Sequence, residues 1–145
     1  MSPRPRPPAG RLRFGLSASS IAALGVLSAG CADHARVWGH VRCGGRPLTE
    51  GTVVLKPLEL KTYTHGSGPL DSRGRFEIFC SRRDMALQPG MYWLSIRPPL
   101  QSDPGTGEIV APPDYPVPDK YRHELESAIQ IEVKPEPMKL ELTLD

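Results

Sequence analysis

Short segments of alternating hydrophobic and polar residues follow one another along the chain after residue 36. A period of two residues is typical of β-strands, because successive side chains point to opposite faces of a sheet. The only helix-like segment, 120–127, is long enough for one or two turns. We predict seven strands, at residues 37–43, 52–56, 63–70, 75–80, 91–97, 128–134 and 138–144. With turn residues between them, they predict an all-β fold, a seven-stranded antiparallel β-sandwich.

Two proline-containing connections are expected to shape this fold. Residues 98–118 contain seven prolines, which predicts a long surface loop without regular sheet or helix. The last two strands alternate cleanly on either side of residues 134–137, the sequence Lys-Pro-Glu-Pro. We therefore expect these two strands to form a C-terminal hairpin.

The first 30 residues have the composition of a secretory signal rather than of a folded element. Four arginines and no acid come first, and an uncharged apolar run of 14 residues follows at 14–27. As a helix this run would be about 21 Å long, too short for a hydrocarbon core of about 30 Å. Residues 1–30 are therefore predicted to be a signal peptide. Residues 31–36 would form a short tether before a single domain at 37–145.

The end of the leader, Ser28-Ala29-Gly30-Cys31, resembles the lipobox of bacterial lipoproteins. The resemblance implies that Cys31 is lipidated and becomes the mature N-terminus. The lipobox prefers Leu at the position of Ser28, so the sequence departs from it there. The alternative is ordinary cleavage that leaves Cys31 as a thiol.

The charge of the chain after the leader argues against binding to nucleic acid and against electrostatic binding to a membrane surface. The chain has 18 Lys and Arg against 16 Asp and Glu, and removing the four leader arginines leaves 14 against 16. A nearly neutral domain without a cluster of basic residues has no electrostatic footprint for nucleic acid. It also has no basic amphipathic helix for a membrane surface, so the expected membrane contact is the lipid at Cys31.

Five short motifs of turn residues and alternating apolar residues follow one another along the chain. They are Gly39-x-Val41-x-x-x-Gly45-x-Pro47-Leu48, Gly51-x-Val53-x-Leu55-x-Pro57, Asp71-x-x-Gly74-x-Phe76, Leu87-x-Pro89-Gly90-x-Tyr92-x-Leu94-x-Ile96 and Pro118-x-Lys120-Tyr121 with Ser127. In this order they resemble the carboxypeptidase-regulatory-like (transthyretin-like) domain, and more narrowly small lipoproteins of planctomycete bacteria. The resemblance covers residues 37–144 and implies a β-sandwich accessory module without known catalytic residues. Cys43, Cys80 and residues 134–137 depart from the family pattern.

Chemistry-bearing residues are scattered in the sequence. The four histidines lie in different predicted elements without the spacing of a zinc site, so no metal or other cofactor is expected. Glu124 and Glu126 beside His123 are interpreted as solvated charges rather than as acid and base groups. Asp71-x-x-Gly74 is interpreted as a turn, because the further oxygen ligands of a calcium loop are missing.

Two pairs of residues keep two interpretations each. Trp38 and Trp93 point away from the inward residues of their strands, either to bind a partner or to pack under the tether and the proline-rich loop. Cys43 and Cys80 would share the oxidising compartment to which the chain is exported, where a disulfide is common. A bridge would close a loop of 38 residues and restrict the unfolded chain by roughly 3 to 4 kcal/mol. Alternatively, each cysteine packs as a small apolar residue, and their strand ends lie at opposite ends of the fold.

These observations predict an exported, lipid-anchored, non-enzymatic β-sandwich module of the bacterial cell envelope with a structural or interaction role. The alternative is a binding module for envelope polysaccharide or protein that uses the 98–118 loop with Trp93, Tyr115 and Tyr121. A third hypothesis is a hydrolase whose site assembles from residues far apart in sequence.

Overall fold

A computed structural model describes residues 35–59, 64–82 and 86–145. The predicted signal peptide, the lipidation site at Cys31 and most of the predicted tether lie outside these residues. In the described part of the chain there are β-strands and one short 3-10 helix, η1 (Asp119–Tyr121), and no α-helix. The all-β prediction is confirmed.

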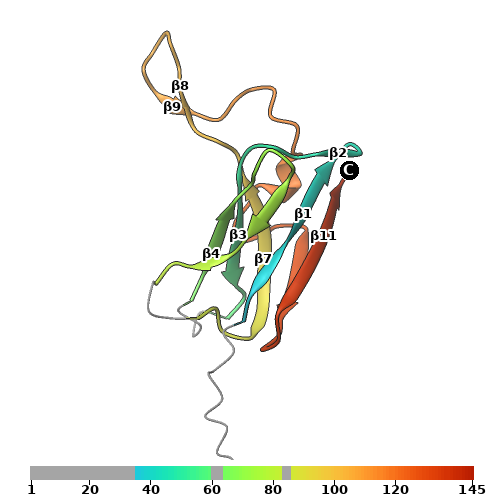
Figure 1. The fold of residues 1–145 in the computed structure, drawn as a ribbon. Helices are drawn as coiled ribbons and strands as arrows, with labels where there is room; N and C mark the ends of the chain where they lie inside the picture. The colour runs from blue at the N-terminus through green and yellow to red at the C-terminus, as the bar shows by residue number, and fades with distance from the viewer. Residues whose placement is uncertain (1–34, 60–63, 83–85) are drawn as a thin grey trace, which may run out of the picture.

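Two main sheets contain most of the strands (Figure 1). In the first sheet, β1 (Val37–Cys43) lies beside β11 (Met138–Leu144) on one edge, and beside β2 (Arg46–Pro47) and β5 (Arg75–Glu77) on the other. The second sheet has the order β10 (Ile129–Val133), β7 (Gly90–Arg97), β3 (Thr52–Pro57), β4 (Gly66–Pro69) and β6 (Phe79–Cys80). A separate two-stranded ribbon joins β8 (Gln101–Ser102) to β9 (Ile109–Val110).

One hydrophobic core lies between the two main sheets. Its members come from the inward positions that the alternation predicts in the long strands, including Val37 and Val41 of β1 and Leu55, Tyr92 and Leu94 of the second sheet. Two sheets that share one core are consistent with a β-sandwich. Gly39 belongs to the inward row of β1, where a Cβ would overlap the backbone oxygen of Leu140. The missing side chain therefore lets β1 and β11 approach closely.

The predicted C-terminal hairpin is wrong. β10 pairs antiparallel with β7 in the second sheet, whereas β11 pairs parallel with β1 in the first. The connection at 134–137 contains two prolines, and proline cannot supply the positive φ that a tight two-residue hairpin needs. The chain therefore crosses from one sheet to the other, and the antiparallel prediction fails for the β1–β11 pair.

The predicted strand 75–80 also changes sheets. Residues 75–77 pair with β1, and residues 79–80 pair with β4. Phe76 and Ile78 are buried while Phe79 is exposed, so the predicted alternation survives the crossing. This segment joins the two sheets at one side of the fold.

The proline-rich segment 98–118 contains regular structure, contrary to the prediction. Gln101 and Ser102 of β8 pair with Ile109 and Val110 of β9 to form the distal hairpin, which we define as residues 101–110. The nearby prolines do not occupy the paired positions. Those at 98, 99, 112 and 113 lie outside the hairpin, and the one at 104 lies in its tip. The paired positions keep their backbone donors, so a short ladder can form. The hairpin projects from the end of the sheets opposite the start of β1 (Figure 1).

Candidate functional site

The predicted binding surface of Trp93, Tyr115 and Tyr121 is not one surface. Tyr115 is only 7% exposed and belongs to the core. Its hydroxyl donates a hydrogen bond to the backbone oxygen of Glu50 at 2.8 Å. Burial raises the pKa of Tyr115 to about 12. A buried ring cannot stack on a partner, so the prediction is wrong for Tyr115.

Tyr115 is held in this buried position by Arg122, a residue that the sequence did not point to. Its guanidinium donates to the backbone oxygens of Val117 at 2.7 Å and Tyr115 at 2.8 Å, and it lies over the Tyr115 ring at 5.4 Å. These contacts hold the end of the proline-rich segment against the domain. Tyr121 packs partly against the core as well, with Lys120 Nζ 4.7 Å from its ring centre.

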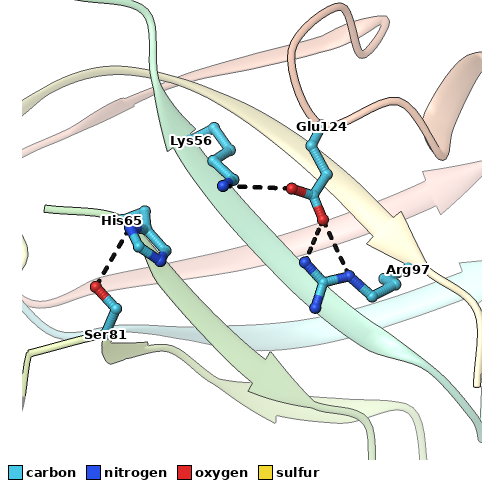
Figure 2. A network of polar contacts seen from close by, with 5 residues as sticks. All are labelled: Lys56, His65, Ser81, Arg97 and Glu124. Carbon is cyan, nitrogen blue, oxygen red and sulfur yellow. Dashed lines mark hydrogen bonds and ion pairs between the residues drawn. The ribbon is translucent and has the colours of Figure 1, made fainter. Parts of the chain in front are cut away.

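Trp93 lies on the other face of β7, where its strand neighbours are Lys56 and Gln130. Across the same face, Glu124 reaches over β3 and β7 and bridges Lys56 and Arg97 (Figure 2). The Lys56 Nζ to Glu124 Oε2 distance is 3.4 Å. Burial alone would raise the pKa of Glu124, but the hydrogen bonds and charges of Arg97 and Lys56 outweigh it, so the pKa is lowered.

Glu124 is therefore not the solvated charge that the sequence suggested, because its side chain is 29% exposed and has two basic partners. Val54 and Ser95, a facing pair on these strands, are buried although the alternation places them outward. The segment that carries Glu124 crosses the same part of the sheet (Figure 2). We interpret this bridge as structural.

The distal hairpin offers an exposed apolar surface. Leu100, which precedes it, and Ile109 are each 64% exposed. The tip is ordered by Asp103, whose Oδ1 accepts hydrogen bonds from the backbone N–H groups of Gly105 and Thr106 at 2.8 Å each. These two donors lower the pKa of Asp103, so it remains an ionised cap at neutral pH. The hairpin therefore presents its apolar side chains from a fixed turn.

An open groove of about 270 Å³ lies at the side of the fold where segment 75–80 joins the two sheets. We call it the Trp38 groove; it is lined by Arg36, Trp38, Pro69, Asp71, Arg75, Phe76, Glu77 and Phe79. Arg36 stacks over the Trp38 ring at 5.3 Å and pairs with Glu77 at 2.6 Å. Phe79 is 60% exposed. An aromatic surface with charged groups at its rim can contact a flat apolar ligand face and its polar edge.

The acids of this groove are engaged in ion pairs. Asp71 pairs with Arg75 at 2.8 Å, and the backbone N–H of Arg75 is the largest cause that lowers the pKa of Asp71. A carboxylate that stays ionised in this way accepts hydrogen bonds but does not serve as a proton donor near neutral pH. The groove therefore suits binding better than acid catalysis.

The histidines with described positions are not brought together. His40 Nδ1 lies 3.3 Å from Glu141, and His65 Nδ1 lies 3.3 Å from Ser81 Oγ (Figure 2). The backbone N–H of Ser81 also donates to the oxygen of His65, which makes this pair an extension of the β4–β6 ladder. Within 35–59, 64–82 and 86–145, no group of three or more His, Cys, Asp or Glu side chains could hold a metal ion.

Of the two interpretations of Cys43 and Cys80, the structure has the one without a disulfide, because both are free thiols. In the register of β1 and β5, Trp38 lies opposite Glu77. From that pair, Cys43 lies five residues further along β1, whereas the chain toward Cys80 runs in the opposite direction and crosses to the second sheet, where Cys80 lies opposite Gly66. Cys43 instead donates to the backbone oxygen of Pro116 at 3.3 Å. Burial, followed by the charge of Asp145, raises the pKa of the Cys43 thiol.

No protein-family model, no curated protein and no solved structure matches the chain. Among the residues that the structure describes, no helix has the length and apolar character needed to cross a membrane.

Proposed function

We propose that the chain is an exported, lipid-anchored, non-enzymatic module of the bacterial cell envelope, held at the membrane through Cys31. The observation that carries this proposal is the short distance along the chain between the lipobox-like stretch and the folded domain. Ala35, four residues after Cys31, already forms a β-bridge with Leu87. A lipid on Cys31 would thus hold the domain within about 14 Å of the bilayer.

The family resemblance supports the same role. Two sheets around one core agree with a carboxypeptidase-regulatory-like, transthyretin-like sandwich. Gly74 has the positive φ that the Asp71–Gly74 turn needs, and Gly45, Gly51 and Gly90 of the other motifs also have positive φ. Such a domain would act as an accessory module. Several acyl chains on one cysteine, at about 0.8 kcal/mol per buried methylene, would anchor it stably.

Export and lipidation can be tested on the full chain expressed in a bacterium that processes lipoproteins. Mass spectrometry should find residues 1–30 removed and acyl mass on Cys31, with the protein in the membrane fraction. The Cys31→Ala variant should be released as soluble protein, whereas the matched Cys43→Ala variant should stay with the membrane. Wild-type protein that is soluble and unmodified would end this proposal.

A second proposed function is a binding module that contacts an envelope protein through the distal hairpin. Leu100, just before the hairpin, and Ile109, within it, are exposed. The hairpin lies at the end of the fold opposite the start of β1 (Figure 1). On a domain held at the membrane by its N-terminal end, this hairpin would point away from the bilayer. Aliphatic side chains favour a protein partner, since polysaccharides are bound mainly by aromatic rings and polar groups, and Tyr115 is buried.

The corresponding experiment compares cross-linked envelope partners of the wild type with those of the double variant Leu100→Ser and Ile109→Ser. The matched control is Leu125→Ser, because Leu125 is 62% exposed but lies outside the hairpin. Loss of one partner from the double variant alone supports the hairpin surface. Equal recovery of every partner, or binding only to isolated envelope polysaccharide, contradicts it.

A further inference from the structure

Strand β11 has one open edge. Within the described part of the chain it pairs with β1 on one side, and no strand pairs with its other side. Met138 donates its N–H to Arg36, and Leu144 accepts the N–H of Gly44, so the even-numbered residues of β11 direct their backbone groups toward β1. Backbone groups alternate along a strand. Those of Lys139, Glu141 and Thr143 therefore point to the open edge.

Both faces of β11 continue up to this edge. On the inner face Met138, Leu140 and Leu142 pack against the core but remain partly exposed. On the outer face Lys139 and Glu141 are exposed. The strand is seven residues long and contains no proline or glycine. An edge of this kind is a template for a further strand, because only surface charges protect it.

We propose that a second copy of the chain pairs with this edge, antiparallel, in a register centred on Leu140. In this register Lys139 faces the partner's Glu141, and Glu141 faces the partner's Lys139. In each facing pair, the backbone N–H and C=O groups of both residues point to the open edge, so the pair can exchange two N–H···O bonds. The outer face then carries two cross-strand pairs of opposite charge, and the inner face sets Leu140 against the partner's Leu140 and Met138 against the partner's Leu142.

Charge selects this register over its neighbours. A register centred on Glu141 would set Glu141 against the partner's Glu141, and one centred on Lys139 would set two lysines opposite each other; like charges directly opposite destabilise a sheet. The open edge of β10 offers no similar pattern, since its outer residues Gln130 and Glu132 contain no positive charge. Glu141 already contacts Lys139 at 2.7 Å and His40 at 3.3 Å within its own chain. These two donors lower the pKa of Glu141, so it is ionised at neutral pH and can be shared.

The pairing does not rest on the lipid anchor, but it is compatible with it. Antiparallel pairing that continues a sheet has its two-fold axis perpendicular to the sheet. With that axis along the bilayer normal, both N-terminal ends lie at the same height, and the strands lie parallel to the membrane. In such a dimer the distal hairpins would point along the bilayer, whereas in a monomer held by its N-terminal end the hairpin would point away from it. Two anchors would also keep the copies at high local concentration, which favours a modest interface.

Cysteine cross-linking tests the register in the full chain, purified in mild detergent with Cys43 and Cys80 changed to Ala. Leu140→Cys should form a dimer on oxidation, because facing residues in a non-hydrogen-bonded pair have Cα atoms about 4.5 Å apart. Leu142→Cys is the matched control: in this register it lies about 13 Å from its own copy and should not cross-link. A mixture of Met138→Cys and Leu142→Cys should cross-link. Equal dimer from Leu140→Cys and Leu142→Cys would overturn the proposal.

Charge reversal tests the same contact without a cysteine. Lys139→Glu places four negative charges at the edge of a dimer and Glu141→Lys places four positive ones, so each variant alone should dimerise about tenfold more weakly than the wild type. An equimolar mixture should restore the dimer, because each copy then faces the opposite charge. Circular dichroism checks that both variants remain folded. Wild-type protein that sediments as a monomer at all concentrations, or single variants that dimerise as it does, would refute the pairing.

Discussion

The bridge made by Glu124 provides a direct test of how the outer face of the second sheet is held. Changing Glu124 to Gln keeps the shape of the side chain and removes its charge. At the observed 3.4 Å from Lys56, two unit charges attract by roughly 5 kcal/mol in a medium of effective dielectric 20. Desolvation of Lys56 and Glu124, which are each 29% exposed, cancels most of this attraction, and solvent weakens the second pair because Arg97 is half exposed. We expect a net loss of about 1 to 2 kcal/mol from the two pairs.

This loss is large enough to measure by thermal unfolding. A domain of about 110 residues has an unfolding entropy of roughly 0.23 kcal/mol per kelvin, so the midpoint should fall by about 4 to 9 °C. The matched control is Glu126→Gln, two residues further along the same segment. Glu126 is exposed and forms none of the described ion pairs. Glu126→Gln should therefore leave the midpoint of unfolding nearly unchanged.

The pH dependence separates charge from shape. The pKa of Glu124 is lowered from its ordinary value of 4.5, so the folded state binds this proton less readily than the unfolded state. The stabilisation is therefore present above about pH 4.5 and is lost as the pH falls through the lowered pKa. Wild type and Glu124→Gln should converge in acid. A deficit that persists in strong acid, or one equal to that of Glu126→Gln at pH 7, would refute the electrostatic explanation.

Three further predictions concern the packing between the loops and the core. Gly51→Ala should destabilise the domain by more than about 3 kcal/mol in urea unfolding, because φ is 113° and the new Cβ would lie 2.8 Å from a backbone oxygen and against the hydroxyl of Tyr115. Gly107→Ala, with positive φ but open space around it, should cost only about 1 kcal/mol. Tyr115→Phe should cost about 1 kcal/mol, and the stability that this tyrosine contributes should be present below pH 10 and decline toward pH 12, as its raised pKa requires. Thiol titration of the unfolded, unreduced protein should find both Cys43 and Cys80 free, with Cys43 reacting more slowly in the folded state.

The alternation of residues correctly predicted the long strands and their inward faces. Val37 and Val41 of β1, and Tyr92, Leu94 and Ile96 of β7, are all buried as expected. Alternation reports which face of a strand is apolar, and that property is local. It could not report that Val54 and Ser95 are buried on the outer face, where η1 contacts β7 and Glu124, 70 residues after Val54, bridges Lys56 and Arg97.

Alternation also cannot name the partner of a strand. β10 and β11 have the same pattern whether they form a hairpin or join different sheets, and only the two prolines between them distinguish the two arrangements. Tyr115, in the predicted binding surface, also shows that a local pattern does not report which distant groups a residue contacts. A tyrosine among prolines predicts an exposed loop, but a guanidinium seven residues later, at Arg122, holds its backbone against the domain. The two residues are close in sequence, but their contact needs the 3-10 turn at 119–121. The sequence indicated a helix-like segment at 120–127 and not what that segment contacts.

The crossing of segment 75–80 from one sheet to the other makes the two sides of the sandwich different. At this side of the fold the segment joins both sheets, and the strands that end the sheets there, β5 and β6, are only three and two residues long, so no long strand edge is exposed in the described residues. The other side ends in β10 and β11, which belong to different sheets and do not pair with each other. A backbone edge is satisfied by water or by another strand, and an edge flanked by partly exposed core residues gains most from the strand. For contacts with other molecules, the side with the Trp38 groove therefore offers side chains, and the opposite side offers the backbone edge of β11.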